Sequence, residues 1–292
     1  MADSFSRVVS CTIDNLAIGK RVEIKDLRIT FDITKTAKSS ENKATIKIFN
    51  LAQTTRDLLQ TRTSEGESLT KVVLRAGFQT SEQKILFRGT GEVVSTHQPP
   101  EWVTTITAED SVKELKAVKF EKKYPAGTTV QDIVKDLLKA AGLSISVEVP
   151  FVVPPLPIAR VFSGDPIKNI EDLASTYNFT FNMQDEGAIL APKNRKPEKR
   201  YQVLLSKSTG LLGRPTIRGP ILVVNALIDA NLRPNNYVEL VTSEPGLSGN
   251  YLIQKAKYKG DSWGGRYAVE LEMTPAPPTD ARLDVITGET FA

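Results

Sequence analysis

The sequence predicts a mainly β protein with a small α+β insert near its middle. Early in the chain, Leu27, Ile29, Phe31 and Ile33 alternate with polar residues, the period of two that places one face of a strand on a core and the other in water. The same alternation returns over residues 267–273. Between these regions, helix-like spacing of apolar residues is followed by strand-like spacing, twice over. We therefore expect two antiparallel β regions flanking a mixed α+β region.

The composition is typical of a globular chain. Its 292 residues are 40% hydrophobic and 25% charged, enough for about two domains with a substantial core. The 38 basic and 34 acidic residues leave a net charge of +4, too small an excess to imply nucleic-acid binding. Because Cys11 is the only cysteine, no intrachain disulfide can form, and folding in a reducing cytoplasm is expected. We recognise neither a signal peptide nor a membrane span.

The first β region is expected to occupy residues 1–118. Its strands are predicted at 7–13, 27–34, 43–49, 71–77, 85–94 and 102–109. The polar segment 35–42 is expected to turn the chain between two of them as a hairpin. Gly89 and Gly91 predict a bulge or a sharp bend. About six strands and one helix would close a small barrel or sandwich.

One helix is predicted where the strand pattern changes at Asn50. Leu51, Leu58 and Leu59 follow at helical spacing, and Asn50 with Gln53 three residues later is typical of an N-cap with its capping-box partner. Strands precede and follow this helix, so we expect it to lie against a sheet as a crossover.

Residues 119–200 are predicted to form the α+β insert. The first helix should be capped by Thr128 or Thr129 and end at Gly142, with a strand over 143–147. The second should begin at Asp165 as N-cap, followed by Pro166 at the first helical position. A strand over 179–183 and a hairpin turn at 185–187 come next, and the proline-rich segment 149–158 joins the two halves stiffly.

The second β region is expected at residues 201–275, after the basic connector 193–200. Its strands are predicted at 221–228, 237–242, 251–258 and 267–273, with a hairpin loop over 259–265. Prolines then prevent the sheet from continuing. Residues 276–292 are predicted to be an extended C-terminal tail.

No catalytic, cofactor-binding or metal-binding residues are predicted. The chain offers only His97 and Cys11, from which no zinc ligand set can be built alone. Cys11 lies in an apolar alternation and is expected to be a buried structural residue. His97, beside two prolines, is expected at the surface. A Ser-His-Asp or Cys-His triad would depend on this histidine, and no Gly-x-Ser-x-Gly turn is present.

Three further patterns have structural interpretations. Glu109 and Asp110 are adjacent, so on a strand they would point to opposite faces and could not act as a glycosidase pair. The segment 88–92 lacks the third glycine and the Lys-Ser/Thr of phosphate-binding loops, which favours a bend in a strand. Lysines at 113, 116, 119, 122 and 123 are interrupted by acidic residues, which favours a solvated face over a nucleic-acid stripe.

The order of packing motifs resembles a known family. The motifs are Ile46–Leu51, the helix with Arg56, Val73–Phe78, Leu86–Gly89, the helix after Gly127, Arg160–Gly164, Gly249–Ile253 and Lys259–Gly264. Together they resemble the central baseplate hub family of contractile-tailed bacteriophages, the late control protein D type, over most of residues 5–275.

This resemblance implies two tube-like antiparallel β-barrel domains flanking the insert, in a structural virion protein of the tail baseplate. Three chains would form a homotrimer whose six related β domains make a pseudo-six-fold ring. The ring would join the six-fold tail tube above to the three-fold spike below, contact other baseplate proteins and let DNA pass without sequence-specific binding. Assembly in the host cytoplasm and no enzymatic activity are implied.

Two other functions remain open from the residues. One is a tail-associated cell-wall hydrolase, and the other is a carbohydrate-binding tail module. Clearing of peptidoglycan would distinguish the enzyme from the hub, and glycan binding by the insert would identify the third possibility.

Overall fold

The structure is a computed structural model of the whole chain. It describes residues 6–15, 18–37, 42–60, 70–79, 83–109, 120–141, 145–146, 153–184, 187–192 and 202–276. The predicted basic connector 193–200 and the predicted tail beyond residue 276 lie outside these ranges, as do both predicted domain boundaries, near 118 and 200.

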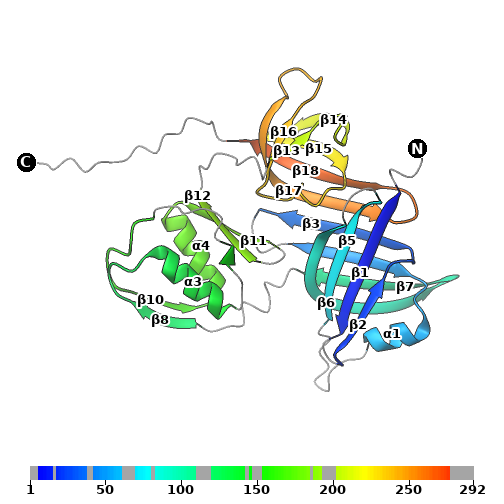
Figure 1. The fold of residues 1–292 in the computed structure, drawn as a ribbon, viewed down its shortest axis with the longest axis horizontal. Helices are drawn as coiled ribbons and strands as arrows, with labels where there is room; N and C mark the ends of the chain where they lie inside the picture. The colour runs from blue at the N-terminus through cyan, green and yellow to red at the C-terminus, as the bar shows by residue number, and fades with distance from the viewer. Residues whose placement is uncertain are drawn as a thin grey trace, which may run out of the picture.

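The first β region contains seven described strands and one helix. They are β1 (Arg7–Asn15), β2 (Lys20–Ile24), β3 (Ile29–Thr36), β4 (Lys43–Phe49), α1 (Gln53–Gln60), β5 (Thr70–Phe78), β6 (Lys84–Gln98) and β7 (Glu101–Glu109). The strands of this region follow the alternation seen in the sequence, since every second residue of β3 and β4 is buried. The helix α1 lies against the sheet and buries Leu59 completely, as a crossover should (Figure 1).

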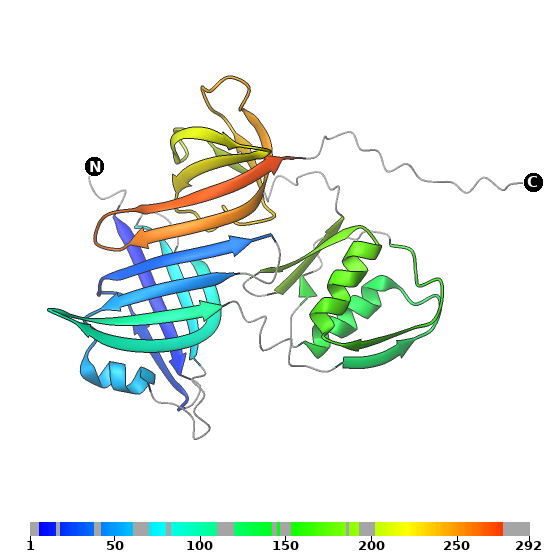
Figure 2. The ribbon, with the colours of Figure 1, turned by 180° about the vertical axis from the view of Figure 1, so that it is seen from behind.

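The second β region adds six described strands. They are β13 (Gln202–Leu205), β14 (Leu211–Arg218), β15 (Ile221–Leu227), β16 (Tyr237–Leu240), β17 (Gly249–Asp261) and β18 (Tyr267–Pro275). Figure 2 shows β17 lying alongside β3, so that one sheet runs through both β regions in the order β14-β15-β18-β17-β3-β4-β7-β6-β5-β1-β2, with β16 on β17 and β13 on β16. Neighbouring strands in this sheet are antiparallel except β13 and β16. The prediction of a mainly β, antiparallel fold is confirmed.

Apolar side chains of the described residues form two separate cores. One cluster is shared by both β regions and includes Ile46 and Val224, both fully buried. The other belongs to the insert, with residues such as Ile133 and Ile170 at its centre. The insert lies to one side of the first β region (Figure 1). Its elements therefore pack on each other, whereas the two β regions pack as one body.

Among the residues that the structure describes, the insert has two helices and short strands. The described elements are β8 (Phe120–Tyr124), α3 (Val130–Ala140), β9 (Ile145–Ser146), β10 (Arg160–Gly164), α4 (Pro166–Thr176), β11 (Phe179–Gln184) and β12 (Gly187–Pro192). Both predicted caps are confirmed. The Thr129 hydroxyl accepts a hydrogen bond from the backbone N–H of Asp132 at 3.2 Å, and the Asp165 carboxylate accepts one from that of Ile167 at 2.8 Å. These bonds fix the starts of α3 and α4.

The predicted role of Asn50 is wrong. Asn50 has a φ of 55°, a left-handed conformation, and α1 begins three residues later at Gln53. Its backbone N–H and side-chain carbonyl bond the backbone of Trp102 instead. Asn50 therefore closes the edge between β4 and β7, because a partner 52 residues away in the sequence outweighs the local capping pattern.

Gly89 and Gly91 lie where β6 changes neighbours, from β5 to β7. A Cβ at either glycine would collide with the backbone of β7, so the glycines permit a sharp bend. The register shift in the β5–β6 pair lies elsewhere, opposite Leu74 and Arg75. The prediction of a bend is therefore correct, and a bulge is not found at these two positions.

Candidate assembly interface

The two β regions share one strand order. In the first region the neighbours are β1-β5-β6-β7-β4-β3, and in the second they are β13-β16-β17-β18-β15-β14. With β2 left aside, the six strands of each region lie in the spatial order first, fourth, fifth, sixth, third, second. In both regions the second and third strands form an antiparallel pair, and so do the fourth with the fifth and the fifth with the sixth. The β1–β5 pair is antiparallel whereas β13–β16 is parallel, and β2 has no counterpart among the described strands. The regions are therefore topological repeats.

The repeat extends to individual positions. Strands β4 and β15 both have seven residues, and the pair next to the hairpin turn is Thr34 with Lys43 in one region and Arg218 with Ile221 in the other. This alignment superposes buried residues on buried residues. Ile46 and Val224 correspond, and both are 0% exposed.

Within the chain, the repeats meet where β17 pairs with β3 from Lys255–Thr36 to Asp261–Thr30. Tyr258 pairs with Ile33, and both are buried. Lys259 forms an ion pair with Asp32 at 2.9 Å on the solvated face. This strand pair makes one continuous sheet of the two regions.

A buried aromatic ring fits against a glycine in this junction. Gly260 pairs with Phe31, and a Cβ at Gly260 would overlap the Phe31 ring. Glycine is thus needed here for a close approach of side chain to backbone. The pairs Ile46–Ile106–Val93 and Val224–Leu271–Ala256 align β6 with β17. His97 is then the counterpart of Gly260, so the fit is specific to this junction.

The last residue of β17 and the loop after it fasten the junction at its end. The Arg28 guanidinium donates to both carboxylate oxygens of Asp261, the shortest bond being 2.7 Å. Burial alone would raise the pKa of Asp261, but the hydrogen bonds from Arg28 and the Trp263 backbone N–H outweigh it and lower the pKa. The Ser262 hydroxyl also accepts a bond from the Ile29 backbone N–H at 2.9 Å. Asp261 therefore binds the residue before β3, and Ser262 binds the start of β3.

Tyr267 links the second region to the far side of the first. Its hydroxyl accepts a hydrogen bond from the Gly77 N–H at 3.0 Å and lies 2.9 Å from the Gly77 carbonyl oxygen. Its ring packs edge-on against Phe31 and Phe78, and Arg7 stacks over it at 5.1 Å. Burial raises the pKa of Tyr267 to about 12, which keeps the phenol protonated as a donor.

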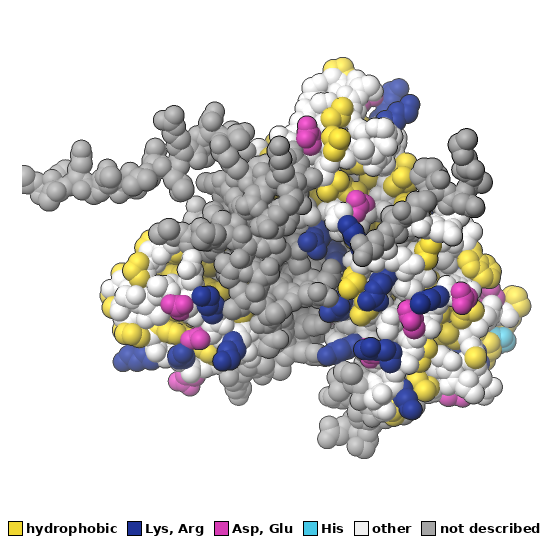
Figure 3. Space-filling model, in the orientation of Figure 1, with side chains coloured by type: hydrophobic (Ala, Val, Ile, Leu, Met, Phe, Trp, Pro, Cys, Tyr) yellow, Lys and Arg dark blue, Asp and Glu magenta, His cyan; other side chains and the backbone are white. Residues whose placement is uncertain are grey.

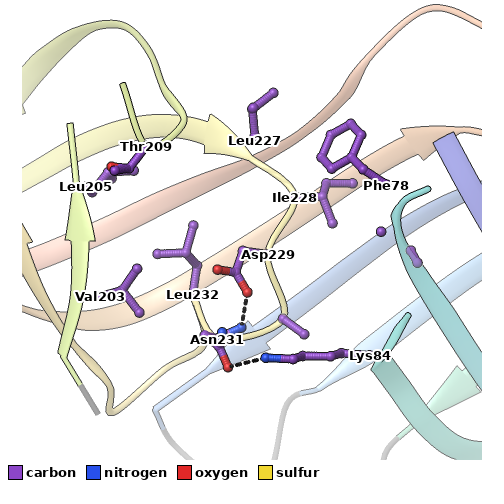
Figure 4. Close-up of a pocket in the computed structure, with 13 residues that line it drawn as sticks. Phe78, Lys84, Val203, Leu205, Thr209, Leu227, Ile228, Asp229, Asn231 and Leu232 are labelled. Atoms are coloured by element: carbon purple, nitrogen blue, oxygen red, sulfur yellow. Dashed lines mark hydrogen bonds between the residues drawn. The ribbon is translucent and has the colours of Figure 1, made fainter. Parts of the chain in front are cut away.

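An open pocket of about 410 Å³ lies between the two regions (Figure 4). Its walls come from β5 and β6 on one side and from the start of the second region and the segment after β15 on the other. Lys84 reaches across it to the side-chain oxygen of Asn231 at 3.5 Å. Among its labelled residues, apolar side chains such as Phe78 and Ile228 line much of the wall. The pocket thus lies along the contact between the two β regions. Asp229 supplies the carboxylate among the residues that line it.

Each repeat also has an edge that is not paired among the described residues. In β6, residues 92–98 pair only with β7, whereas the matching half of β17 has β18 on one side and β3 on the other. In β14, one side pairs with β15 and the other has no described partner, whereas β3 is paired on both sides. Ile217 and Val94 on these edges are 62% and 48% exposed.

The residues singled out for chemistry do not converge on a site. Cys11 is fully buried in β1, and burial raises the pKa of its thiol to about 12, so its nucleophilic thiolate is disfavoured. His97 is exposed near the end of β6, with its ring 4.9 Å from that of Trp102. In the described part of the chain, no group of three His, Cys, Asp or Glu side chains could hold a metal ion.

The charged candidates are also dispersed. Glu109 ends β7 and lies 3.5 Å from Lys43, and residues 88–92 lie within β6. Lys122 binds Asp136 at 2.5 Å. Asp110 and lysines 113, 116 and 119 lie outside the described residues. On the face shown in Figure 3, side chains of both signs are spread over the β regions and the insert.

None of the described helices is long and apolar enough to cross a membrane.

Comparison with known proteins gives a family match over nearly the whole chain. The family model described as "Baseplate hub gp41" matches residues 8–273. Comparison of the sequence with individual curated proteins finds no match.

Solved structures with a similar fold include phage tail proteins. The 43 kDa tail protein of prophage MuSo2 from Shewanella oneidensis has a TM-score of 0.62 at 9% identity, over 92% of this chain and 99% of that one. A tail protein from Neisseria meningitidis MC58 has a TM-score of 0.59 at 11% identity, over 91% and 96%. The E. coli c3393 protein, a component of the type VI secretion system, has a TM-score of 0.55 at 14% identity, over 85% and 73%. At these identities the likeness shows the fold alone.

Proposed function

Because the chain belongs to the baseplate hub gp41 family, and is thus a structural protein of a bacteriophage tail baseplate, we propose that it forms the central hub as a ring of three copies. The ring joins the tail tube on one side to the spike on the other. It also contacts other baseplate proteins and surrounds a channel through which DNA passes.

The observation that carries this proposal is the internal repeat. A chain with two β units of the same strand order contributes two similar units to a ring, so three chains contribute six. Such a ring presents six similar faces to a six-fold tube while the chain itself repeats three times, which suits a three-fold spike. The exposed strand edges supply the contacts between units.

The ring acts through contacts rather than bond chemistry. Support comes from the buried, poorly ionised Cys11 and from the exposed position of His97 on Trp102. The division of the chain into two tube-like barrel domains, an insert over 119–200 and a C-terminal tail is part of this proposal. The insert, with a core of its own, projects from the ring as a contact for other baseplate proteins.

The mass of the purified chain in solution tests the ring. Light scattering after size exclusion should give three times the chain mass of 32.1 kDa, and the particle should bind purified tube subunits and the spike protein at separate faces. A particle of one or two chains, or one that binds neither partner, contradicts the proposal.

A second assay tests the absence of enzymatic activity. Purified peptidoglycan incubated with the chain should show no release of soluble fragments at any pH between 4 and 9, with lysozyme as a positive control. Reproducible cleavage would favour the hydrolase alternative. Binding of glycans by the insert within the whole chain would favour the carbohydrate-binding alternative.

A further inference from the structure

We infer that residues 94–96 of β6 pair, antiparallel, with residues 216–218 of β14 in a neighbouring copy of this chain. This inference rests on the proposed ring and specifies its contact between chains. The junction inside the chain serves as the template, since β17 corresponds to β6 and β3 corresponds to β14 in the repeat.

The register follows from the alignment of the repeats. Ile46 pairs with Ile106, which pairs with Val93. In the second region Val224 pairs with Leu271, which pairs with Ala256. Val93 therefore corresponds to Ala256, and both are buried. Residues 94–96 then correspond to residues 257–259 of β17.

The partner strand is aligned in the same way. Residues 32–34 of β3 correspond to 216–218 of β14, because their pairs along β4 and β15 match from the hairpin inward. Within the chain, Lys257, Tyr258 and Lys259 pair with Thr34, Ile33 and Asp32. The equivalent pairs between copies are Val94 with Arg218, Ser95 with Ile217, and Thr96 with Thr216.

Exposure differs between the two junctions as the inference requires. Ile33, paired with Tyr258 of β17, is 0% exposed, whereas the corresponding Ile217 is 62% exposed. Leu212, at the start of the same open edge, is 37% exposed. A large apolar side chain is thus exposed to solvent at a position whose counterpart in the other repeat is fully buried. Addition of the strand would remove this exposed surface from water.

An aromatic residue marks the same place in both repeats. Trp102 corresponds to Tyr267, and each has an arginine over its ring: Arg56 at 4.1 Å and Arg7 at 5.1 Å. Tyr267 is 6% exposed because it contacts the neighbouring repeat, whereas Trp102 is 38% exposed. We expect the neighbouring copy to cover Trp102.

A second copy is the occupant that fits both edges. The two open edges belong to different strands, one in each repeat, so a head-to-tail contact satisfies one edge on each partner and leaves the other available. Such heterologous contacts form a closed ring when the rotation permits. A partner of another kind would satisfy only one edge and leave the other exposed.

The bulge in β14 sets the limit of the predicted register. Three residues, Gly213, Arg214 and Pro215, take the place of Phe31. On the facing strand, His97 takes the place of Gly260. Inside the chain, the large ring of Phe31 faces Gly260. Between copies, the large side chain of His97 would instead face the bulge that contains Gly213. Pairing beyond Thr96 is therefore expected to differ from the junction inside the chain.

Disulfide trapping tests the register. The variant Thr96→Cys with Thr216→Cys places two cysteines opposite each other on neighbouring copies, at the distance of about 5 Å that a disulfide spans. Under mild oxidation the full chain should give covalent trimers as the main species on non-reducing gels. The control Glu92→Cys with Thr216→Cys is four positions out of register, about 13 Å along the strand, and should remain uncrosslinked, as should each single variant.

A second variant tests the edge without a covalent bond. Ile217→Lys alters a residue that is exposed in the single chain, so its melting temperature as a monomer should be unchanged while the solution mass falls to one third of the wild-type value. A wild-type trimer that neither crosslinks in register nor responds to Ile217→Lys overturns the inference and leaves the proposed ring intact. A wild-type chain that remains a monomer, or associates through this edge only with tube subunits, overturns the inference as well, and the monomer also contradicts the proposed function.

Discussion

The two β regions have the same strand order but different surroundings. In the second region, the long strand β17 is covered on both sides over its last residues, and its partner β3 is covered as well. In the first region the matching half of β6 has one described neighbour, and so does β14. One chain thus contains one complete junction and, in β6 and β14, the counterparts of its two strands, each with one described neighbour. The complete copy shows which residues the incomplete copy should bury.

The largest expected effect comes from the core that the repeats share. Ile48 in β4 is 0% exposed, so Ile48→Asp would bury an unpaired carboxylate. We expect a loss of several kcal/mol in the free energy of unfolding, enough to prevent folding. The matched control is Lys47→Asp, whose side chain faces solvent on the same strand and should leave the chain folded. A soluble Ile48→Asp protein with a normal denaturation curve would show that the core face is misassigned.

A smaller effect distinguishes the complete junction from the open one. Tyr267→Phe removes the hydroxyl that bonds the buried N–H of Gly77, so denaturant titration should show a loss of about 1–3 kcal/mol. The matched change Trp102→Phe, at the corresponding open position, should cost less in the monomer because Trp102 is partly exposed. Equal losses in the two monomeric variants would argue against the difference between the junctions.

The smallest effect is a pH dependence at Asp261, the last residue of β17. The pKa of Asp261 is lower in the folded chain than its ordinary value of 3.8. Its stabilising contribution is therefore present above that value and is lost as the pH falls through the folded pKa. Melting temperatures of wild type and Asp261→Asn should differ at pH 7 and converge as the pH falls below the folded pKa of Asp261.

Asp14→Asn provides the control for this measurement. Asp14 pairs with Arg21 between two strands that are adjacent in the sequence, so its loss should not separate the β regions. We expect a smaller change in melting temperature than for Asp261→Asn. If the two variants behave alike across the pH range, Asp261 does not fasten the junction.

Much of the fold could be predicted because local chemistry determined it. The caps of α3 and α4 were predictable because Thr129 and Asp165 bond backbone groups only two or three residues away. The alternation of β3 and β18 was predictable because each has one buried face. Strand β8 was not predicted, because three charged residues occupy its middle. Strand β14 was not predicted, because Gly213 and Pro215 interrupt its strand-like pattern.

The candidate interface could be predicted only in outline. Similar β character at both ends of the chain suggested related regions, but the pairing of β17 with β3 joins residues more than 200 positions apart, and no local pattern encodes such a neighbour. Asn50 shows the same limit on a smaller scale, since Trp102 determines its conformation. Strand order had to be known before Ile217 could be recognised as the exposed counterpart of Ile33.

The most direct test of the repeat as the basis of the ring is an electron cryomicroscopy map of the purified assembly in which strands are resolved. We expect a three-fold axis with an axial channel and six β units around it, in which β17–β3 junctions within chains alternate with β6–β14 junctions between chains. An assembly without a three-fold axis, or one in which residues 92–98 and β14 remain unpaired, would contradict it.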